Sequence, residues 1–315
     1  MMTLSVVVPT YNEQDGINEI YNAVKTLFEQ RLTDYAMELL FIDNASTDNT
    51  RVLIEALCQQ DRRVKAIFNN SNVGFHRSSF YGITQSTGDA TVLLYADLQE
   101  PPSVIAQFVA EWEKGAKVVV GVKNKSNENK LIYWMRQRYY RLLSAISDNH
   151  HIIQYNGFGL YDRSFVDVLR TMRDPLPYFR GVVSELGPNY AKVYYTQEKR
   201  KKGKTHYNFI GMYDFAMLGI TSSSKAVMRI ATFFGIILAC LCMIVAVVTL
   251  IMKLCDWNSI PIGTAALVVG LFFLGAIELL FIGLLGEYIS SINIRVMQHP
   301  LVVEEKRINL EPDDK

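Results

Sequence analysis

The chain has 315 residues, of which 50% are hydrophobic, and its formal net charge at pH 7 is +1. The length allows one large domain or two small ones, and the near-neutral charge gives no reason to expect nucleic acid as a partner. The four cysteines form no CxxC pair, which argues against a disulfide framework and fits a reducing cytoplasm. The N-terminus lacks the basic segment of a signal peptide.

Residues 1–207 alternate strand-like and helix-like segments. A β-branched run at Leu4–Pro9 precedes helical spacing over 15–30, and Leu39–Ile42 precedes helix signals after Ser46. This alternation predicts an α/β fold with a doubly wound, mostly parallel sheet, whose ligands bind at the carboxyl ends of the strands. Further strands are predicted at Val64–Phe68, Ala90–Leu94 and Lys117–Val122, with helices near 75–86 and 101–114.

Polar residues follow the predicted strands. Oxygen atoms of Asp97 and Gln99, two residues apart, can share Mg²⁺ or Mn²⁺, which would hold and neutralise a diphosphate. The alternative is that Asp97 caps the helix after Pro101. Carboxylates in Asp43–Asp48 can accept hydrogen bonds from a base or ribose, or form a turn and the N-cap of the next helix. The three segments are Pro9–Glu13, Asp43–Asp48 and Asp97–Gln99.

Two long apolar runs follow, at residues 231–252 and 260–286. The first contains no charged residue and the second contains only Glu278. Because about 20 apolar residues span a bilayer core, two adjacent runs predict a two-helix transmembrane hairpin rather than buried core helices. Glu278 is interpreted as a contact to a neighbouring helix or subunit, or as a group near a lipid carrier.

Basic residues flank the two runs and predict their orientation. By the positive-inside rule, residues 1–230 and 288–315 lie in the cytoplasm and the loop 253–259 lies outside. The flanking cations are Arg200, Lys201, Lys202, Lys204, Lys225 and Arg229 before the runs, and Arg295, Lys306 and Arg307 after them.

The chain therefore divides into four parts. A catalytic-type α/β domain over 1–207 is followed by interfacial amphipathic helices at 208–230. Two transmembrane helices over 231–290 precede a cytoplasmic tail over 291–315. The tail is charged from about residue 303 and is predicted to be disordered.

Taken together, these segments resemble the inverting glycosyltransferases of family 2. They are most similar to the polyprenyl-phosphate glycosyltransferases, which include dolichol-phosphate mannose synthase and the bacterial GtrB and ArnC types. The resemblance covers nearly the whole chain, including the membrane hairpin. Its matching stretches are 6–13, 42–50, 72–90, 96–102, 136–144, 160–169, 200–207, 219–235 and 283–292.

The resemblance implies a GT-A fold, a nucleotide-sugar donor, a divalent metal (Mg or Mn) and a polyprenyl (undecaprenyl) phosphate acceptor. The enzyme would act with inversion at the cytoplasmic face of the inner (plasma) membrane, as a multi-pass homo-oligomer, in cell-surface glycan modification. By the resemblance, the donor contacts are Pro9, Tyr11, Glu13, Asp43, Arg200 and His206, and the metal ligands are Asp97 and Gln99. The acceptor-phosphate cations are Lys123, Arg136, Arg138 and Arg141, and the catalytic set is Asp97, Arg138 and Lys123.

Some positions depart from the family pattern or allow another interpretation. Tyr95 stands where the family has the first acid of a DAD motif, Thr205-His206 replaces a serine–lysine pair, and Gly157–Leu160 replaces DFRL. The three arginines at 136–141 can also form a solvated helix face. The missing charges motivate an alternative function, a non-catalytic scaffold that binds a nucleotide or lipid within a glycan-assembly complex.

Overall fold

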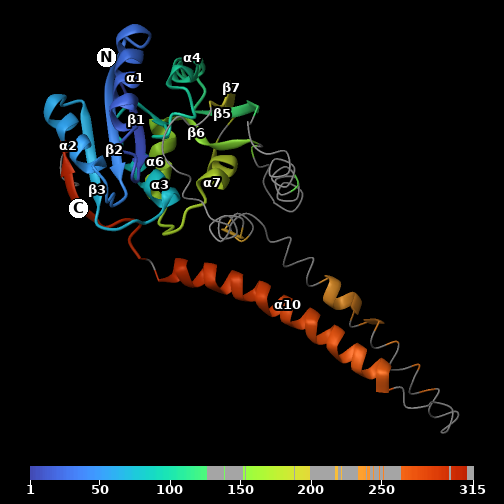
Figure 1. Ribbon diagram of the computed structural model, residues 1–315. Coiled ribbons are helices and arrows are strands. Elements are labelled where there is room, and N and C mark those ends of the chain that lie inside the picture. The colour runs from blue at the N-terminus through green and yellow to red at the C-terminus, as the bar shows by residue number, and fades with distance from the viewer. Residues whose placement is uncertain are drawn as a thin grey trace.

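The computed structural model describes residues 1–125, 154–187, 189–198, 264–297 and 299–310. It also describes positions 138, 152, 217–218, 221, 233–238, 240–241, 244, 248 and 251. A sheet covered by helices forms the body, and one long helix leads away from it (Figure 1).

The described strands form one sheet in the order β7-β5-β6-β4-β1-β2-β3-β8. Strands β4, β1, β2 and β3 pair in parallel, as β5 does with β7, whereas β6 is antiparallel to β4 and β5 and β8 is antiparallel to β3. The predicted α/β fold with a mostly parallel sheet is confirmed. The strands are β1 (Met2–Thr10), β2 (Tyr35–Asp43), β3 (Val64–Asn69), β4 (Ala90–Leu93), β5 (Val118–Lys125), β6 (Tyr155–Asp162), β7 (Ala191–Thr196) and β8 (Glu304–Ile308).

Helices cover both faces of this sheet, which explains the near-continuous apolar runs of the central strands. In β1, Val6 and Val8 pack with residues of α1, α2 and α4, while Val7 packs on the opposite face with residues of α3, α6 and α7. The described helices are α1 (Ile17–Gln30), α2 (Thr50–Gln60), α3 (Phe75–Gln85), η1 (Pro102–Val104), α4 (Ile105–Glu113), α6 (Arg163–Thr171), α7 (Phe179–Leu186) and α10 (Thr264–Val296).

Strand β6 was not predicted from the sequence, because its glycines are typical of a loop. The structure explains Gly159, since a Cβ there would lie 2.5 Å from the carbonyl oxygen of Val119 on β5. The glycine therefore allows two strand backbones to approach closely. The result is an antiparallel strand between β4 and β5 that is buried at every position except the half-buried Asn156.

A buried carboxylate ties the amino-terminal half of β2 to its neighbours. Glu38 is only 3% exposed, and it pairs with Lys65 at 2.6 Å and accepts hydrogen bonds from Ser5 and Thr87. Burial alone would raise the pKa of Glu38, but these bonds outweigh it and the pKa lies below its usual value. The stabilisation is therefore present above the unfolded-state pKa and is lost as the pH falls through the folded-state pKa.

Replacing Glu38 with glutamine should destabilise the domain by about 2 kcal/mol at pH 7, because Lys65 loses its charged partner. Thermal unfolding of the detergent-solubilised chain measures this loss of stability. The difference in Tm between variant and wild type should become smaller near pH 4. Glu111→Gln, which removes an exposed ion pair with Lys114, is the control and should change the Tm little. A gap that is unchanged at low pH would contradict the prediction.

Helix α10 (Thr264–Val296) corresponds to the second apolar run, 260–286, and continues ten residues beyond the end of that run. Its segment Phe273–Val296 has 24 residues and a mean hydropathy of 1.6, and none of the side chains described for it is buried within the chain. By length and composition this segment can cross a membrane. Most of residues 208–263, which hold the predicted interfacial helices, the first membrane run and the loop, lie outside the described residues.

The prediction of a disordered tail is wrong for residues 304–308. These residues form β8, which pairs with the edge of β3 (Figure 1). Charged side chains that suggested disorder find partners there: Lys306 pairs with Glu55 of α2 at 2.8 Å, and Arg307 hydrogen-bonds Gln85 of α3 at 2.9 Å. Asn309 then donates to the carbonyl oxygens of Cys58 and Val64.

Candidate active site

Three loops follow the carboxyl ends of the neighbouring strands β1, β2 and β4. Each loop holds one non-glycine residue with a left-handed backbone: Asn12 (φ 54°), Ala45 (φ 61°) and Leu98 (φ 52°). Such conformations persist only when the surroundings impose them, and they concentrate at ligand sites. The three loops are the polar segments that the sequence singled out.

Side-chain hydrogen bonds join the first two loops. The amide of Asn12 donates to Ser46 Oγ at 2.9 Å, and the amide of Thr47 donates back to Asn12 Oδ1 at 2.8 Å. The third loop lies close as well, because a Cβ on Gly16 would be 2.9 Å from the carbonyl oxygen of Ala96. The structure therefore brings the three predicted segments together at one edge of the sheet.

The predicted donor contacts in the described residues gather around this edge. Pro9 is buried near the end of β1, where it pairs with Ile42 of β2. Tyr11 and Glu13 are half-buried in the loop that follows. The amide of Glu13 donates to Thr50 Oγ1 at 2.9 Å, which fixes the loop against the start of α2.

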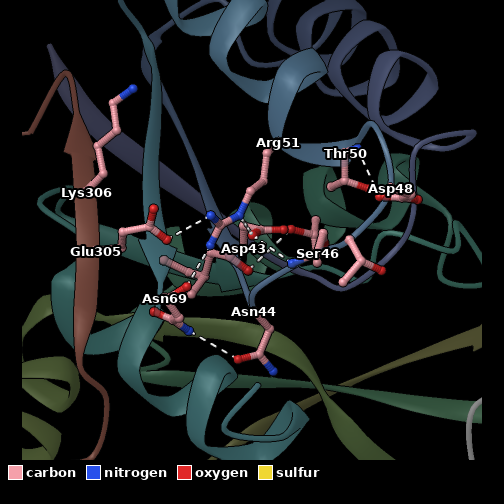
Figure 2. A network of polar contacts seen from close by, with 12 residues as sticks. Asp43, Asn44, Ser46, Asp48, Thr50, Arg51, Asn69, Glu305 and Lys306 are labelled. Carbon is pink, nitrogen blue, oxygen red and sulfur yellow. Dashed lines mark hydrogen bonds and ion pairs between the residues drawn. The ribbon is translucent and has the colours of Figure 1, made fainter. Parts of the chain in front are cut away.

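Asp43 has an unusual environment at the end of β2 (Figure 2). The residue is fully buried, and its Oδ2 atom accepts hydrogen bonds from the Ser46 amide at 3.1 Å and from Arg51 Nε at 2.7 Å. Within the described residues, the buried Oδ1 atom has no hydrogen-bond partner. Because a buried carboxylate oxygen without a partner is costly, a ligand N–H or O–H fits that position.

A second cluster lies where β4, β5 and β7 end and the antiparallel strand β6 begins. Glu100 is 1% exposed; its Oε1 atom lies 3.4 Å from Lys123 Nζ and accepts hydrogen bonds from Asn156 at 2.8 Å and Tyr195 at 3.1 Å. Burial raises the pKa of Glu100, and the charge of Lys123 opposes that shift. Lys123, predicted to bind the acceptor phosphate, is thus paired with the residue that directly follows the predicted metal ligand Gln99.

The oxygen atoms of Asp97 and Gln99 suit Mg²⁺ or Mn²⁺. Asp97 Oδ1 accepts the Gln99 amide at 3.1 Å, as in an Asx turn, and Gln99 Oε1 accepts a hydrogen bond from Gln197 at 2.5 Å. No group of three or more His, Cys, Asp or Glu side chains suited to a metal occurs among the described residues. One carboxylate, from Asp97, and one amide oxygen, from Gln99, fit Mg²⁺, which proteins commonly hold with one or two carboxylates plus substrate phosphates.

Tyr95, at the position of the missing acid, has a structural role. Its hydroxyl donates to the carbonyl oxygen of Asn156 at 2.6 Å, and burial raises its pKa well above the usual value, so the phenol stays neutral. A Cβ on Gly157 would lie 2.8 Å from that hydroxyl. Tyr95 and Gly157 therefore fit one another, and the two departures from the family pattern have one packing explanation.

The remaining predicted residues are not placed at the site. Arg138 is described only as an exposed helical position, and Arg136, Arg141, Arg200 and His206 lie outside the described residues. Conversely, the sequence reasoning missed four residues, Arg51, Glu100, Asn156 and Gln197. Only Glu100 had a usable signal, since a carboxylate between Gln99 and the Pro-Pro pair extends the polar segment by one residue.

Residues 5–170 match the family model described as "Glycosyl transferase family 2". The chain belongs to this family. It is 32% identical to "Uncharacterized glycosyltransferase YkcC" of Bacillus subtilis (strain 168), over 98% of this chain and 94% of that one. It is 31% identical to "Prophage bactoprenol glucosyl transferase homolog" of Escherichia coli (strain K12), over 95% and 97%. The family assignment makes the chain a glycosyltransferase, as the sequence predicted.

Two further comparisons extend the family assignment. "Bactoprenol glucosyl transferase" of Shigella phage SfII is 30% identical, over 97% of this chain and 98% of that one. Among solved structures, mannosyl-3-phosphoglycerate synthase from Rubrobacter xylanophilus superposes with a TM-score of 0.51 at 14% identity, over 74% of this chain and 75% of that one. This likeness concerns the fold alone and agrees with the predicted GT-A architecture of family 2.

Proposed function

We propose that this family 2 enzyme transfers a sugar from a nucleotide-sugar donor to a polyprenyl phosphate of the undecaprenyl type. The reaction takes place with inversion at the cytoplasmic membrane face and serves cell-surface glycan modification. One observation carries the proposal: relatives named bactoprenol glucosyl transferases match nearly the whole chain at about 30% identity, including α10. The two polar clusters at the sheet edge supply chemistry suited to that reaction.

The donor and acceptor would occupy the two clusters. Pro9, Tyr11, Glu13 and Asp43 would contact the nucleoside, with Arg200 and His206 near the diphosphate. The acceptor phosphate would be held by Lys123 together with Arg136, Arg138 and Arg141, because a cation close to a phosphate forms a strong, charge-assisted hydrogen bond.

The bond changes need little acid–base help from the protein. A lipid phosphate oxygen forms a bond to the anomeric carbon as the bond from that carbon to the nucleotide β-phosphate oxygen breaks, and the electron pair leaves with the nucleoside diphosphate. No proton must be removed from the acceptor, since a phosphate monoester is mostly dianionic at pH 7. Asp97 and Gln99 would hold Mg²⁺ or Mn²⁺, which when bound neutralises the leaving diphosphate. The residues therefore act by positioning and by charge.

The sheet topology supports a multi-pass arrangement. Strands β1–β7 precede α10 and β8 follows it, yet β8 pairs with β3 in the same sheet. If α10 crosses the membrane, the chain must cross an even number of times for β8 to return to that side. The apolar run at 231–252 is long enough for the second crossing. We therefore propose a two-helix hairpin with the catalytic domain in the cytoplasm, and a homo-oligomeric state remains a prediction.

This topology is tested by cysteine labelling in intact cells, using a chain without its four native cysteines. A cysteine at Asn258, in the connecting loop, should react with a membrane-impermeant maleimide added outside. A cysteine at Lys114, which is exposed on the catalytic domain, should react only after the cells are lysed. Labelling of position 114 from outside would overturn the topology and the supply of donor from the cytosol.

The proposed reaction is tested with a donor screen on the purified full chain. Release of nucleoside diphosphate is measured for a panel of UDP-, GDP-, CDP- and ADP-linked sugars, with and without undecaprenyl phosphate, and the lipid product is analysed for its anomeric configuration. Release that depends on the lipid and gives an inverted product is the expected result. Nucleotide binding without turnover for any donor would instead favour the non-catalytic scaffold.

A further inference from the structure

The guanidinium of Arg51 is held in three directions (Figure 2). Nε contacts Asp43 Oδ2 at 2.7 Å, Nη2 donates to the Asn69 carbonyl oxygen at 2.7 Å, and Nη1 pairs with Glu305 Oε2 at 2.8 Å. The centre of the Phe68 ring lies 5.5 Å from the Cζ atom of Arg51. Arg51 therefore links the ends of β2 and β3 to the carboxy-terminal strand β8.

This arrangement fixes one oxygen of Asp43 and leaves the other for a ligand. Arg51 and the Ser46 amide both bond to Oδ2, whereas Oδ1 is buried with no hydrogen-bond partner among the described residues. A buried carboxylate needs a paired cation, and the planar guanidinium sets the plane of the carboxylate as well as its charge. The direction in which Oδ1 points thus depends on Arg51.

We propose that Arg51 is a positioning residue for donor recognition, and that β8 belongs to the donor site through Glu305. The inference rests on the proposed function, in which Asp43 binds the nucleoside. In this arrangement the strand that follows the membrane helix supports the group that recognises the soluble substrate. Glu305 has an exposed side chain (54%), so its share is smaller than that of Asp43.

Strand β8 also offers a matched control. Lys306 is the next residue on the strand, its side chain is similarly exposed (53%), and it forms its own ion pair with Glu55 of α2 at 2.8 Å. The two pairs both join β8 to α2, but only the Glu305 pair reaches a residue that touches Asp43. Comparing Glu305→Gln with Lys306→Gln separates donor positioning from docking of the strand.

The experiment measures Kd values of the full-length chain for UDP, GDP, CDP and ADP in the presence of Mg²⁺, together with Tm. For the nucleotide that wild type binds best, Arg51→Lys should raise Kd about tenfold, as expected on misplacing a charged hydrogen-bond acceptor. Glu305→Gln should raise it about two- to threefold and Lys306→Gln should leave it unchanged. Where turnover is detected, the donor KM should rise while the lipid KM and kcat stay near wild type.

A double-substitution cycle completes the test. Asp43→Asn should itself weaken nucleotide binding, and adding Arg51→Lys to it should cause little further loss, because Arg51 acts through Asp43. Fully additive losses, or unchanged binding by Arg51→Lys in a chain that binds a nucleotide, would overturn the inference and leave the proposed function standing. A wild-type chain that binds none of the four nucleotides would overturn the donor site itself.

Discussion

Replacing Asp97 with asparagine is expected to lower kcat by about 100- to 1000-fold, the usual cost of removing one charged group that stabilises a transition state. Asp97 is the only carboxylate of the proposed metal pair, and its Oδ1 atom also accepts the amide of Gln99 at 3.1 Å. Asparagine can preserve this turn but cannot supply the negative charge that a divalent cation requires. Initial rates at saturating donor and lipid measure the effect.

Two controls accompany the Asp97 experiment. Tyr95→Phe should change kcat far less, since the Tyr95 hydroxyl bonds to the Asn156 carbonyl oxygen and serves packing. Excess chelator should abolish turnover by wild type, and Mg²⁺ or Mn²⁺ should restore it. Full turnover with the chelator present would refute the metal requirement, while equal losses at Asp97 and Tyr95 would point to a folding defect.

The second large effect is expected at Lys123, whose side chain is only 12% exposed and lies 3.4 Å from the buried Glu100. Lys123→Met should raise the lipid KM at least about tenfold through the lost phosphate contact. It should also destabilise the chain by about 3 kcal/mol, because the buried carboxyl group of Glu100 loses the cation that pairs with it. Lipid titrations and thermal unfolding measure the two effects separately.

A double variant separates these two roles of Lys123. Adding Glu100→Gln to Lys123→Met removes the buried charge, while the amide oxygen can still accept hydrogen bonds from Asn156 and Tyr195. Stability should largely return, but the lipid KM should stay high and nucleotide affinity should stay near wild type. Recovery of the lipid KM in the double variant would show that Lys123 has only a structural role.

The sequence predicted the central strands and the loops after them because those features are local. Buried strands such as Val6–Val8 are continuous apolar runs, and the polar segments that follow end each run abruptly. Strand β6 was not predicted, because its Gly159 allows the close approach of β5, a contact that the sequence does not reveal. Strand β8 was not predicted, because its charged side chains pair with residues of α2 and α3 that are distant along the chain.

The candidate site divides in the same way. Asp43, Asp97 and Gln99 were predictable as polar residues at strand ends, and Lys123 from the family resemblance. Arg51 was not, because it resembles any exposed arginine in the first turn of a helix until Asp43, Asn69 and Glu305 surround it. Residues that bind a ligand leave patterns in sequence, whereas those that support them depend on the tertiary structure.

The place of β8 in the sheet also has a consequence for how the protein is made. Residues Glu304–Ile308 leave the ribosome after α10, so the edge of β3 stays open until α10 has been synthesised. An open strand edge can pair with another chain, and the nascent protein is most exposed to aggregation during that interval. Recombinant versions of the chain should therefore keep residues through Asn309 and carry any tag beyond them, because a shorter chain would leave the edge of β3 permanently unpaired.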